Sequence, residues 1–246
     1  MTNVDRRHAG EASAEFAAAW TECDQVPGWL TRDQALALWT SARDLPRGGC
    51  AVEIGSHQGR STVALGHGAR GAGGMVVAID PFLEGHVFGG QRTRERFERN
   101  ITRARLNDVV HLEPDYSENV LARWSGQVDL LFIDGKHDFW SCTKDIGWVK
   151  HMHDGARVLV HDAFSSVGVT TSLLAEVLRP STRLRYTGRS GSLAAFTVGH
   201  PSVAQRAAVG RELGWFCRNL IIKVLLRLRF RSVTRLLGHR SPHDPY

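Results

Sequence analysis

The middle of the chain alternates short apolar runs with segments of helical periodicity. The runs typical of buried strands are residues 50–55, 75–80, 108–113, 128–134, 156–162, 183–188 and 192–198. Helical patterns lie between most of them, and this alternation predicts βαβ units with a mostly parallel sheet covered by helices on both faces. The last two runs flank a turn at residues 189–191, which predicts a hairpin at one edge of the sheet.

Helical patterns also flank this region. Residues 11–45 are expected to form helices, the second opening at a capping box in which Thr31 is the cap and Gln34 reaches back. A further amphipathic helix is expected over residues 202–237. Its basic residues recur every four positions at Lys223, Arg227, Arg231 and Arg235. The predicted parts are an N-terminal helical extension (1–45), a central domain (46–200) and a basic C-terminal helix (201–246).

The net charge of +6 is concentrated in that C-terminal helix. Residues 201–246 hold nine basic and two acidic residues, so the first 200 residues are close to neutral. The basic balance therefore does not indicate a nucleic-acid partner for the central domain, and none is expected. The helix is too charged to span a membrane. It is expected to cover its own domain or a dimer partner, with a membrane-surface contact or a polyanion contact as the alternatives.

The N-terminus and the cysteines bear on localisation. The N-terminal sequence lacks the apolar run of a signal peptide. The four cysteines, Cys23, Cys50, Cys142 and Cys217, form no CxxC pair, which argues against a zinc knuckle and a disulfide framework. They are expected to be small buried residues. These features predict a cytoplasmic protein, with membrane association through the C-terminal helix as the alternative.

Polar residues and glycines follow the first predicted strand. Glu53 ends it, and Gly55 and Gly59 allow a tight turn into a helix that begins near Arg60. Glycines at such a turn let the backbone approach a ligand and leave helix N–H groups exposed. A dinucleotide site requires G-x-G-x-x-G, and His57 stands where the second glycine belongs. A pyrophosphate ligand is therefore disfavoured.

Polar residues also follow the next two predicted strands. Asp80 closes the second strand, where an acid accepts hydrogen bonds from the two hydroxyls of a ribose. Asp115 and Ser117 follow the third strand and are candidates to bracket an adenine ring. The ordered set indicates a nucleoside-bearing ligand more strongly than one acid alone.

The fourth and fifth predicted strands end in candidate metal ligands. Asp134 ends one strand, and His161 with Asp162 ends the next. Adjacent parallel strands lie about 4.8 Å apart, so their ends can converge on one cation. Two carboxylates and an imidazole suit Mg²⁺ or Mn²⁺. In the alternative interpretation, the carboxylates cap turns and His161 satisfies a backbone carbonyl.

These residues together resemble class I S-adenosylmethionine-dependent methyltransferases. The resemblance is greatest to the metal-assisted small-molecule O-methyltransferases that act on sugars, glycosylated macrolides and catechols. The similar motifs are E-I-G-S-x-x-G-R-S at 53–61, Asp80, F-I-D-G-x-H at 132–137 and V-H-D at 160–162. The resemblance covers about residues 28–198. It implies an α/β, Rossmann-like class I methyltransferase fold with a mostly parallel seven-stranded sheet.

The resemblance also implies roles for the matching positions. The residues expected to hold S-adenosylmethionine are Glu53, Gly55, Ser56, Ser61, Asp80, Asp115, Ser117 and Asp134. The expected shell of a divalent metal, Mg²⁺ or Mn²⁺, is Asp134, His161 and Asp162, although many relatives carry an acid where this chain has His161. His137 falls where relatives place a general base, and a structural or metal-linked histidine is the alternative.

The chemistry accounts for these residue types. A sulfonium methyl is already electrophilic, so the enzyme must align a hydroxyl with it and remove the hydroxyl proton. A cation lowers the hydroxyl pKa, while a histidine accepts the proton, a contribution of about 10²–10⁴-fold. Lys136 would need its pKa lowered by burial to act as the base, and Asp138 is expected to cap the next helix. The aromatic residues that follow strand ends, and that would stack on a sugar or pack in the core, are Phe82, Phe88, Phe139, Trp140 and Phe164.

The sequence therefore predicts an O-methyltransferase acting on a hydroxyl of a sugar, polysaccharide or glycosylated metabolite. Its partners are expected to be a small-molecule or oligosaccharide substrate and a second copy in a homodimer. The alternatives are a catechol or phenol O-methyltransferase, a metal-independent methyltransferase, and a non-catalytic adaptor that binds a membrane or an acidic partner through its C-terminal helix.

Overall fold

The structure is a computed structural model that describes residues 3–85 and 89–239. The chain forms two compact units, which divide between Leu131 and Phe132 within strand β4 (Val128–Ile133). The three-part division into 1–45, 46–200 and 201–246 stays a prediction.

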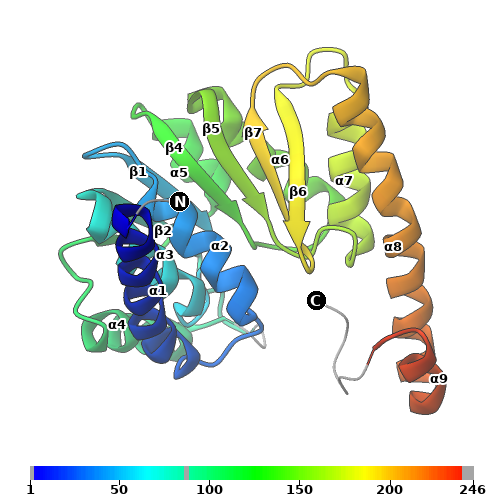
Figure 1. The fold of residues 1–246 in the computed structure, drawn as a ribbon, viewed down its shortest axis with the longest axis horizontal. Coiled ribbons are helices and arrows are strands. Elements are labelled where there is room, and N and C mark those ends of the chain that lie inside the picture. The colour runs from blue at the N-terminus through cyan, green and yellow to red at the C-terminus, as the bar shows by residue number, and fades with distance from the viewer. Residues whose placement is uncertain (1–2, 86–88, 240–246) are drawn as a thin grey trace. The chain divides into compact units, whose positions relative to one another are not determined.

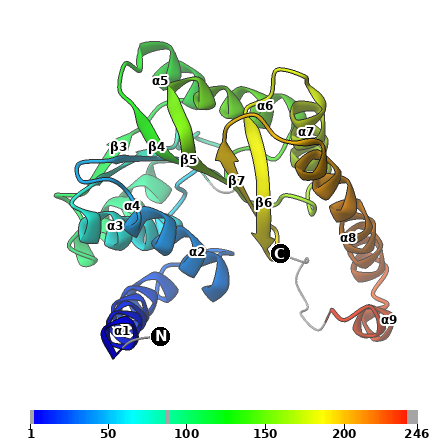
Figure 2. The same cartoon turned by 45° about the horizontal axis from the view of Figure 1, so that its top comes forward.

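Over its described residues, unit 1, which ends at Leu131, contains three parallel strands, the first part of β4 and five helices (Figure 1). The strands are β1 (Cys50–Ile54), β2 (Met75–Ile79) and β3 (Val110–Glu113). The helices are α1 (Asn3–Asp24), α2 (Arg32–Arg43), α3 (Arg60–Ala72), α4 (Gln91–Arg103) and α5 (Ser117–Arg123). The register pairs Ile54 with Ile79 and Ile79 with Glu113, so the carboxyl ends of β1, β2 and β3 meet at one edge. Both α1 and α2 pack against α3, and Figure 2 shows α2 beside α3.

Unit 2, from Phe132 onward, contains the remaining strands and helices. The strands are β5 (Met152–Val160), β6 (Leu184–Ser190) and β7 (Leu193–Val198). The helices are α6 (Phe139–Ile146), the 3₁₀ helix η1 (Gly147–His151), α7 (Val167–Leu178), α8 (Val203–Arg227) and α9 (Arg231–Leu236). β7 pairs antiparallel with both β5 and β6, which confirms the predicted hairpin. The strand order along the sheet is β3-β2-β1-β4-β5-β7-β6, with β6 at the edge.

The capping and burial signals of the sequence correspond to the contacts expected of them. Thr31 and Gln34 form the predicted capping box at the start of α2, with both reciprocal hydrogen bonds present. Asp138 caps α6 as predicted, because its side chain accepts a hydrogen bond from the backbone N–H of Ser141. Every residue of β4 is buried, including Asp129, and the burial of the apolar residues 130–133 agrees with a strand covered on both faces.

The prediction of one C-terminal helix over residues 202–237 is wrong in one respect. The helix ends at Arg227, and a second short helix begins at Arg231. The chain turns between them because Arg229 adopts a left-handed conformation, with φ 64°. The basic stripe is therefore interrupted, and Lys223 donates a hydrogen bond to the Ser165 carbonyl at 2.9 Å. The last residues of the predicted part 201–246, from 240 on, lie outside the described residues.

Candidate active site

The end of β1 carries a buried carboxylate. Glu53 is fully buried, and its two oxygens accept hydrogen bonds from the hydroxyls of Ser61 and Thr62, each at 2.5 Å. These bonds hold the first turn of α3 against β1. Hydrogen bonds to a charged acceptor are stronger than those between neutral groups. Ser56, in the turn between them, is also buried, and its hydroxyl has no hydrogen-bond partner among the described residues.

The turn after β1 is built from left-handed conformations. Gly55 and Gly59 have φ 89° and 90°, which glycine adopts without strain. A side chain on Gly59 would also meet the Phe97 ring at 3.2 Å. His57 has φ 47°, an uncommon conformation for a residue with a side chain, and such strain concentrates at functional sites. The turn therefore lacks the second glycine of a dinucleotide motif but keeps a tight, left-handed path.

Asp80 at the end of β2 fixes this turn. Its carboxylate accepts hydrogen bonds from the backbone N–H groups of His57, at 2.8 Å, and Phe82, at 2.9 Å. Burial raises the pKa of Asp80, against the lowering effect of these backbone donors. A carboxylate has about four acceptor sites, so Asp80 retains capacity for ligand hydroxyls.

Asp115 after β3 is tied to its own helix. Its oxygens accept hydrogen bonds from the backbone N–H of Tyr116, the Asn119 amide and the Arg123 guanidinium. The Asn119 and Arg123 donors hold the pKa of Asp115 below its ordinary value. Ser117 begins α5 next to it. The adenine role of Asp115 and Ser117 stays a prediction.

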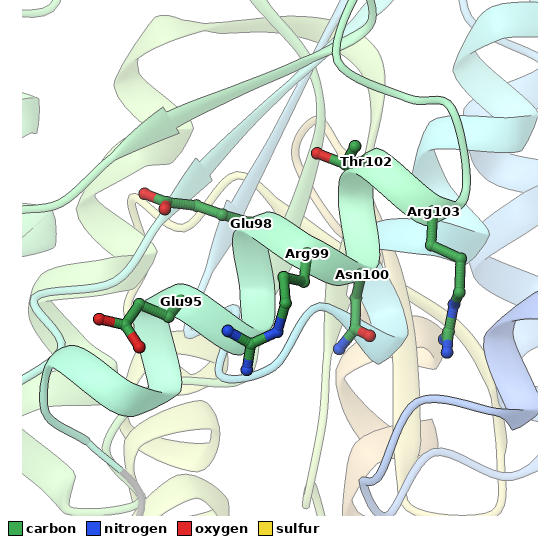
Figure 3. Close-up of a pocket in the computed structure, with 6 residues that line it drawn as sticks. All are labelled: Glu95, Glu98, Arg99, Asn100, Thr102 and Arg103. Carbon is green, nitrogen blue, oxygen red and sulfur yellow. The ribbon is translucent and has the colours of Figure 1, made fainter.

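A surface hollow of about 660 Å³ lies along α4. Figure 3 shows that its lining side chains, Glu95, Glu98, Arg99, Asn100, Thr102 and Arg103, all come from this helix. It contains none of the predicted site residues. One lining residue bears on the site, because the Asn100 amide donates a hydrogen bond to the Gln58 carbonyl in the turn after β1 at 2.8 Å.

Unit 2 brings together two carboxylates and two imidazoles at the ends of β4 and β5. Asp134 Oδ1 lies 3.0 Å from His161 Nδ1 and 3.4 Å from His137 Nε2. Asp162 Oδ2 lies 3.1 Å from His137 Nδ1. The backbone N–H of His161 donates to the Ile133 carbonyl at 2.9 Å, which holds the two strand ends in register. We call Asp134, His137, His161 and Asp162 the strand-end cluster.

Opposite charges stabilise one another inside this cluster. Burial lowers the pKa of His161, but the neighbouring carboxylates of Asp134 and Asp162 outweigh it and raise that pKa to about 9. The hydrogen bond with Asp134 raises the pKa of His137. Burial raises the pKa of Asp134, but His161 and His137 together lower it by a larger amount, so the net change is downward. His161 is almost fully buried, whereas 44% of the His137 side chain is exposed, so His137 is the member of the pair open to a substrate.

The loop after β5 is strained and is held by α8. Asp162 and Phe164 both have left-handed conformations, with φ 53° and 57°. The Asn219 amide donates to the Phe164 carbonyl at 3.0 Å, and the Lys223 ammonium group donates to the Ser165 carbonyl. These contacts fix the position of the Asp162 carboxylate relative to β5.

The donor set of this cluster suits a divalent cation by its chemistry. Two carboxylates and a buried imidazole are ligand types for Mg²⁺ or Mn²⁺, and Asp162 Oδ1 is buried with no hydrogen-bond partner among the described residues. Over the described ranges, however, no group of three or more His, Cys, Asp and Glu residues is arranged to hold a metal ion. The side chains pair with one another instead, so metal binding would require them to turn.

Among the described residues of the predicted aromatic set, one ring is exposed. Phe82 and Phe164 are buried in the core, and Phe88 lies outside the described residues. Trp140 is 73% exposed, and its ring packs edge-on against Phe139 at 5.0 Å. Trp140 comes three residues after His137 and is the most exposed of the described rings of this set.

Sequence reasoning missed three residues that support these groups. Thr62 completes the bonding of Glu53, Asn100 fixes the turn after β1, and Asn219 fixes the loop after β5. A signal existed only for Thr62, because a buried carboxylate requires more than one donor. The contacts of Asn100 and Asn219 join positions 42 and 55 residues apart, and no local pattern indicates them.

Comparisons with known proteins agree with this geometry. Residues 52–163 match the family described as a methyltransferase domain. Cofactor-bound Rv0187 from MTB is 22% identical with a TM-score of 0.58, and the match covers 77% of this chain and 91% of that one. An O-methyltransferase from Bacillus cereus in complex with SAH is 18% identical with a TM-score of 0.56, over 76% of this chain and 90% of that one.

A third similar structure is the O-methyltransferase TomG from Streptomyces achromogenes in complex with SAM. It is 17% identical with a TM-score of 0.54, and the match covers 77% of this chain and 90% of that one. The chain thus has the Rossmann-like fold of class I methyltransferases, and its residues 52–163 match a methyltransferase domain.

Proposed function

We propose that this chain is an S-adenosylmethionine-dependent O-methyltransferase that methylates a hydroxyl of a sugar, polysaccharide or glycosylated metabolite. The observation that carries the proposal is the position of His137, an exposed imidazole whose two nitrogens lie 3.1 Å and 3.4 Å from the carboxylates of Asp162 and Asp134. An imidazole held by a carboxylate at one nitrogen is suited to accept a proton at the other, and the longer contact, between Nε2 and Asp134, is the one that would open to the acceptor.

The residues of unit 1 would bind the cofactor. The buried Ser56 hydroxyl has no hydrogen-bond partner among the described residues and is available to a polar ligand group. Asp80 keeps free acceptor sites for the ribose hydroxyls. Glu53 and Ser61 would hold the turn around the amino-acid end of the cofactor, through the hydrogen bond that the Ser61 hydroxyl donates to Glu53.

The residues of the strand-end cluster would then remove the acceptor proton. S-adenosylmethionine, when bound, supplies an electrophilic methyl group on sulfur. With the methyl group passing to the acceptor oxygen and S-adenosylhomocysteine as the leaving group, His137 would accept the hydroxyl proton at Nε2, once that nitrogen leaves its 3.4 Å contact with Asp134. The carboxylates of Asp134 and Asp162 stabilise the positive charge that develops on the ring. Trp140 would offer a flat face to the acceptor.

A divalent cation is the second part of the proposal. When bound, such a cation lowers the pKa of an acceptor hydroxyl and orients it. Asp134, His161 and Asp162 would hold it, with the two carboxylates supplying the charge. The buried Asp162 Oδ1 favours this role. The metal-independent alternative keeps the same carboxylates as partners of His137 alone.

A methyl-transfer assay with labelled cofactor tests the activity. The panel contains sugars, oligosaccharides and catechols, each with and without Mg²⁺. His137→Gln should lower kcat by about 10²–10⁴-fold and leave S-adenosylmethionine affinity unchanged. Lys136→Gln is the matched control, because Lys136 is the exposed neighbour and should not alter kcat. Unchanged turnover in His137→Gln would contradict the role of this imidazole, and transfer only to catechols would favour the phenol alternative.

Two further measurements separate the remaining alternatives. Titration of Mn²⁺ by calorimetry should show binding that Asp162→Asn weakens, and full activity after EDTA would exclude the metal. S-adenosylmethionine should bind the purified chain with an affinity that Asp80→Ala reduces. No binding of the cofactor would instead favour the non-catalytic adaptor.

A further inference from the structure

The outer face of α8 carries an uncharged stripe. At 3.6 residues per turn, positions spaced by three and four lie on one side of a helix. The positions that share this side, and that are all exposed, are Gly210, Leu213, Gly214, Cys217, Ile221, Val224 and Leu228. We call this set the apolar stripe. Its most apolar part is open to solvent, since Ile221, Val224 and Leu228 are 52%, 53% and 59% exposed.

Three further apolar side chains are exposed in α9 and at its N-cap. Phe230, Val233 and Leu236 recur every three residues and are 54%, 42% and 87% exposed. In both views α8 runs past the end of β6, and α9 lies beyond it (Figures 1 and 2). Large exposed apolar patches mark interaction sites more often than scattered single residues do.

The opposite face of α8 already has its own packing partners. Val209, Asn219 and Ile222 are buried, and α8 packs against β6 and α7. The Asn219 amide is bonded to the Phe164 carbonyl. The helix is therefore anchored to unit 2 by one face, and the apolar stripe is not needed for that packing.

Basic residues border the apolar stripe on both sides. Helical spacing places Arg211 and Arg218 along one border and Arg227 along the other, and Arg229 follows the end of the helix. Glu212 is the single acid of the described residues 203–239, and it bonds Tyr186 and Arg189 on the inner side of the helix. The exposed face therefore combines apolar and positive groups.

We propose that the apolar stripe and its basic borders bind the surface of an anionic lipid bilayer. A helix with an apolar face and basic borders lies in the interface, with its apolar side chains at the boundary of the acyl chains. Long basic side chains then extend to the headgroups. No helix among the described residues is long and apolar enough to cross a membrane, so the contact would be at the surface.

The combination of positive and apolar groups favours an anionic bilayer over a second copy of the chain or a nucleic acid. In a second copy, the same face would bring two sets of arginines together and repel. A nucleic acid would match the arginines but would leave Ile221, Val224 and Leu228 in water. An anionic bilayer offers a partner to both kinds of group.

Vesicle binding of the full chain tests the proposal. Cosedimentation should be stronger with vesicles of phosphatidylcholine and phosphatidylglycerol than with phosphatidylcholine alone, and should weaken at high salt. Cys217 lies on the apolar stripe and is the exposed cysteine, so it accepts an environment-sensitive fluorophore. Its emission should shift to the blue when anionic vesicles are added.

Matched variants identify the surface. Ile221→Asp should weaken binding to anionic vesicles by at least about tenfold. Leu178→Asp, on the exposed surface of α7, introduces the same charge outside the stripe and should bind like the parent. Equal melting temperatures of the two variants show that folding is retained.

The vesicle results that would overturn the proposal are equal binding to neutral and anionic vesicles, equal losses in the two variants, and no binding to either vesicle. Self-association that Ile221→Asp abolishes in the absence of lipid would assign the stripe to a homodimer instead.

Discussion

The carboxylate of Asp80 accepts a hydrogen bond from the backbone N–H of His57 at 2.8 Å. The end of β2 thereby fixes the turn that follows β1, and it does so at a residue with a left-handed backbone. One side chain can then hold the turn and, in our proposal, meet the ribose. Removing its charge should therefore affect both the affinity and the shape of the site.

Asp80→Asn should weaken S-adenosylmethionine binding by about 10- to 100-fold, because a hydrogen bond to a charged group contributes about 1.5–3 kcal/mol. Calorimetric titration measures the change. Asp108→Asn removes an exposed carboxylate of the same unit and serves as the control. Equal affinities of Asp80→Asn and the parent would contradict the ribose role.

Thr62→Val should lower the free energy of unfolding by about 1–3 kcal/mol. The hydroxyl is fully buried and donates to Glu53, so its loss leaves a buried carboxylate oxygen with fewer donors. Urea unfolding measures the effect. Combined with Glu53→Gln, the two losses should not add, because they remove the same bond. Additive losses would show that Glu53 and Thr62 act independently.

The positions of strands and helices could be predicted from the sequence because each leaves a periodic or local signal. The apolar run of β4, the capping box at Thr31 and the cap at Asp138 all depend on residues within a few positions of one another. The break at Arg229 was missed, because a single left-handed residue in an otherwise helical pattern leaves no change of periodicity.

From the sequence, the candidate site could be predicted only as a group of residues at the ends of strands. Parallel strands carry their ends to one edge, so Asp134 and His161 could be expected to meet, and they lie 3.0 Å apart. The pairing of His137 with both Asp134 and Asp162 could not be read from spacing, since it depends on side-chain rotamers. The support from Asn100 and Asn219 comes from distant helices and required the structure.

Cys217 should react with iodoacetamide at pH 8 much faster than the other three cysteines. The thiolate is the reactive form, and burial raises the pKa of Cys23 and Cys50 to about 12 and that of Cys142 to about 11. Cys217 is exposed. Peptide mass spectrometry after timed labelling measures each rate. Comparable labelling of Cys23 or Cys142 in the folded protein would contradict their burial.

Asp138 should contribute to stability above its ordinary pKa and lose that contribution in acid. The N–H of Ser141 holds the pKa of Asp138 at about 2, below the ordinary 3.8. The stabilisation is therefore complete above pH 3.8 and falls as the pH drops toward 2. Because the side chain is partly exposed, we expect about 1 kcal/mol.

Urea unfolding across this pH range tests the cap. Asp138→Ala should lose about 1 kcal/mol at neutral pH. Asp138→Asn retains a cap oxygen without a titrating group, so it should lose less and should show a flatter pH dependence. An acid dependence in Asp138→Asn equal to that of the parent would assign the effect to other carboxylates.

Asn219→Ala should lower the free energy of unfolding by about 1–3 kcal/mol, because the Phe164 carbonyl loses its donor in a buried environment. Phe164 and Asp162 are held in left-handed conformations, and this bond opposes their relaxation. Lys223→Ala is the comparison, since the Lys223 ammonium group also donates to this loop but from a partly exposed position. It should have the smaller effect in urea unfolding. A loss in Lys223→Ala equal to that in Asn219→Ala would mean that burial of the Asn219 bond is not what holds the loop after β5.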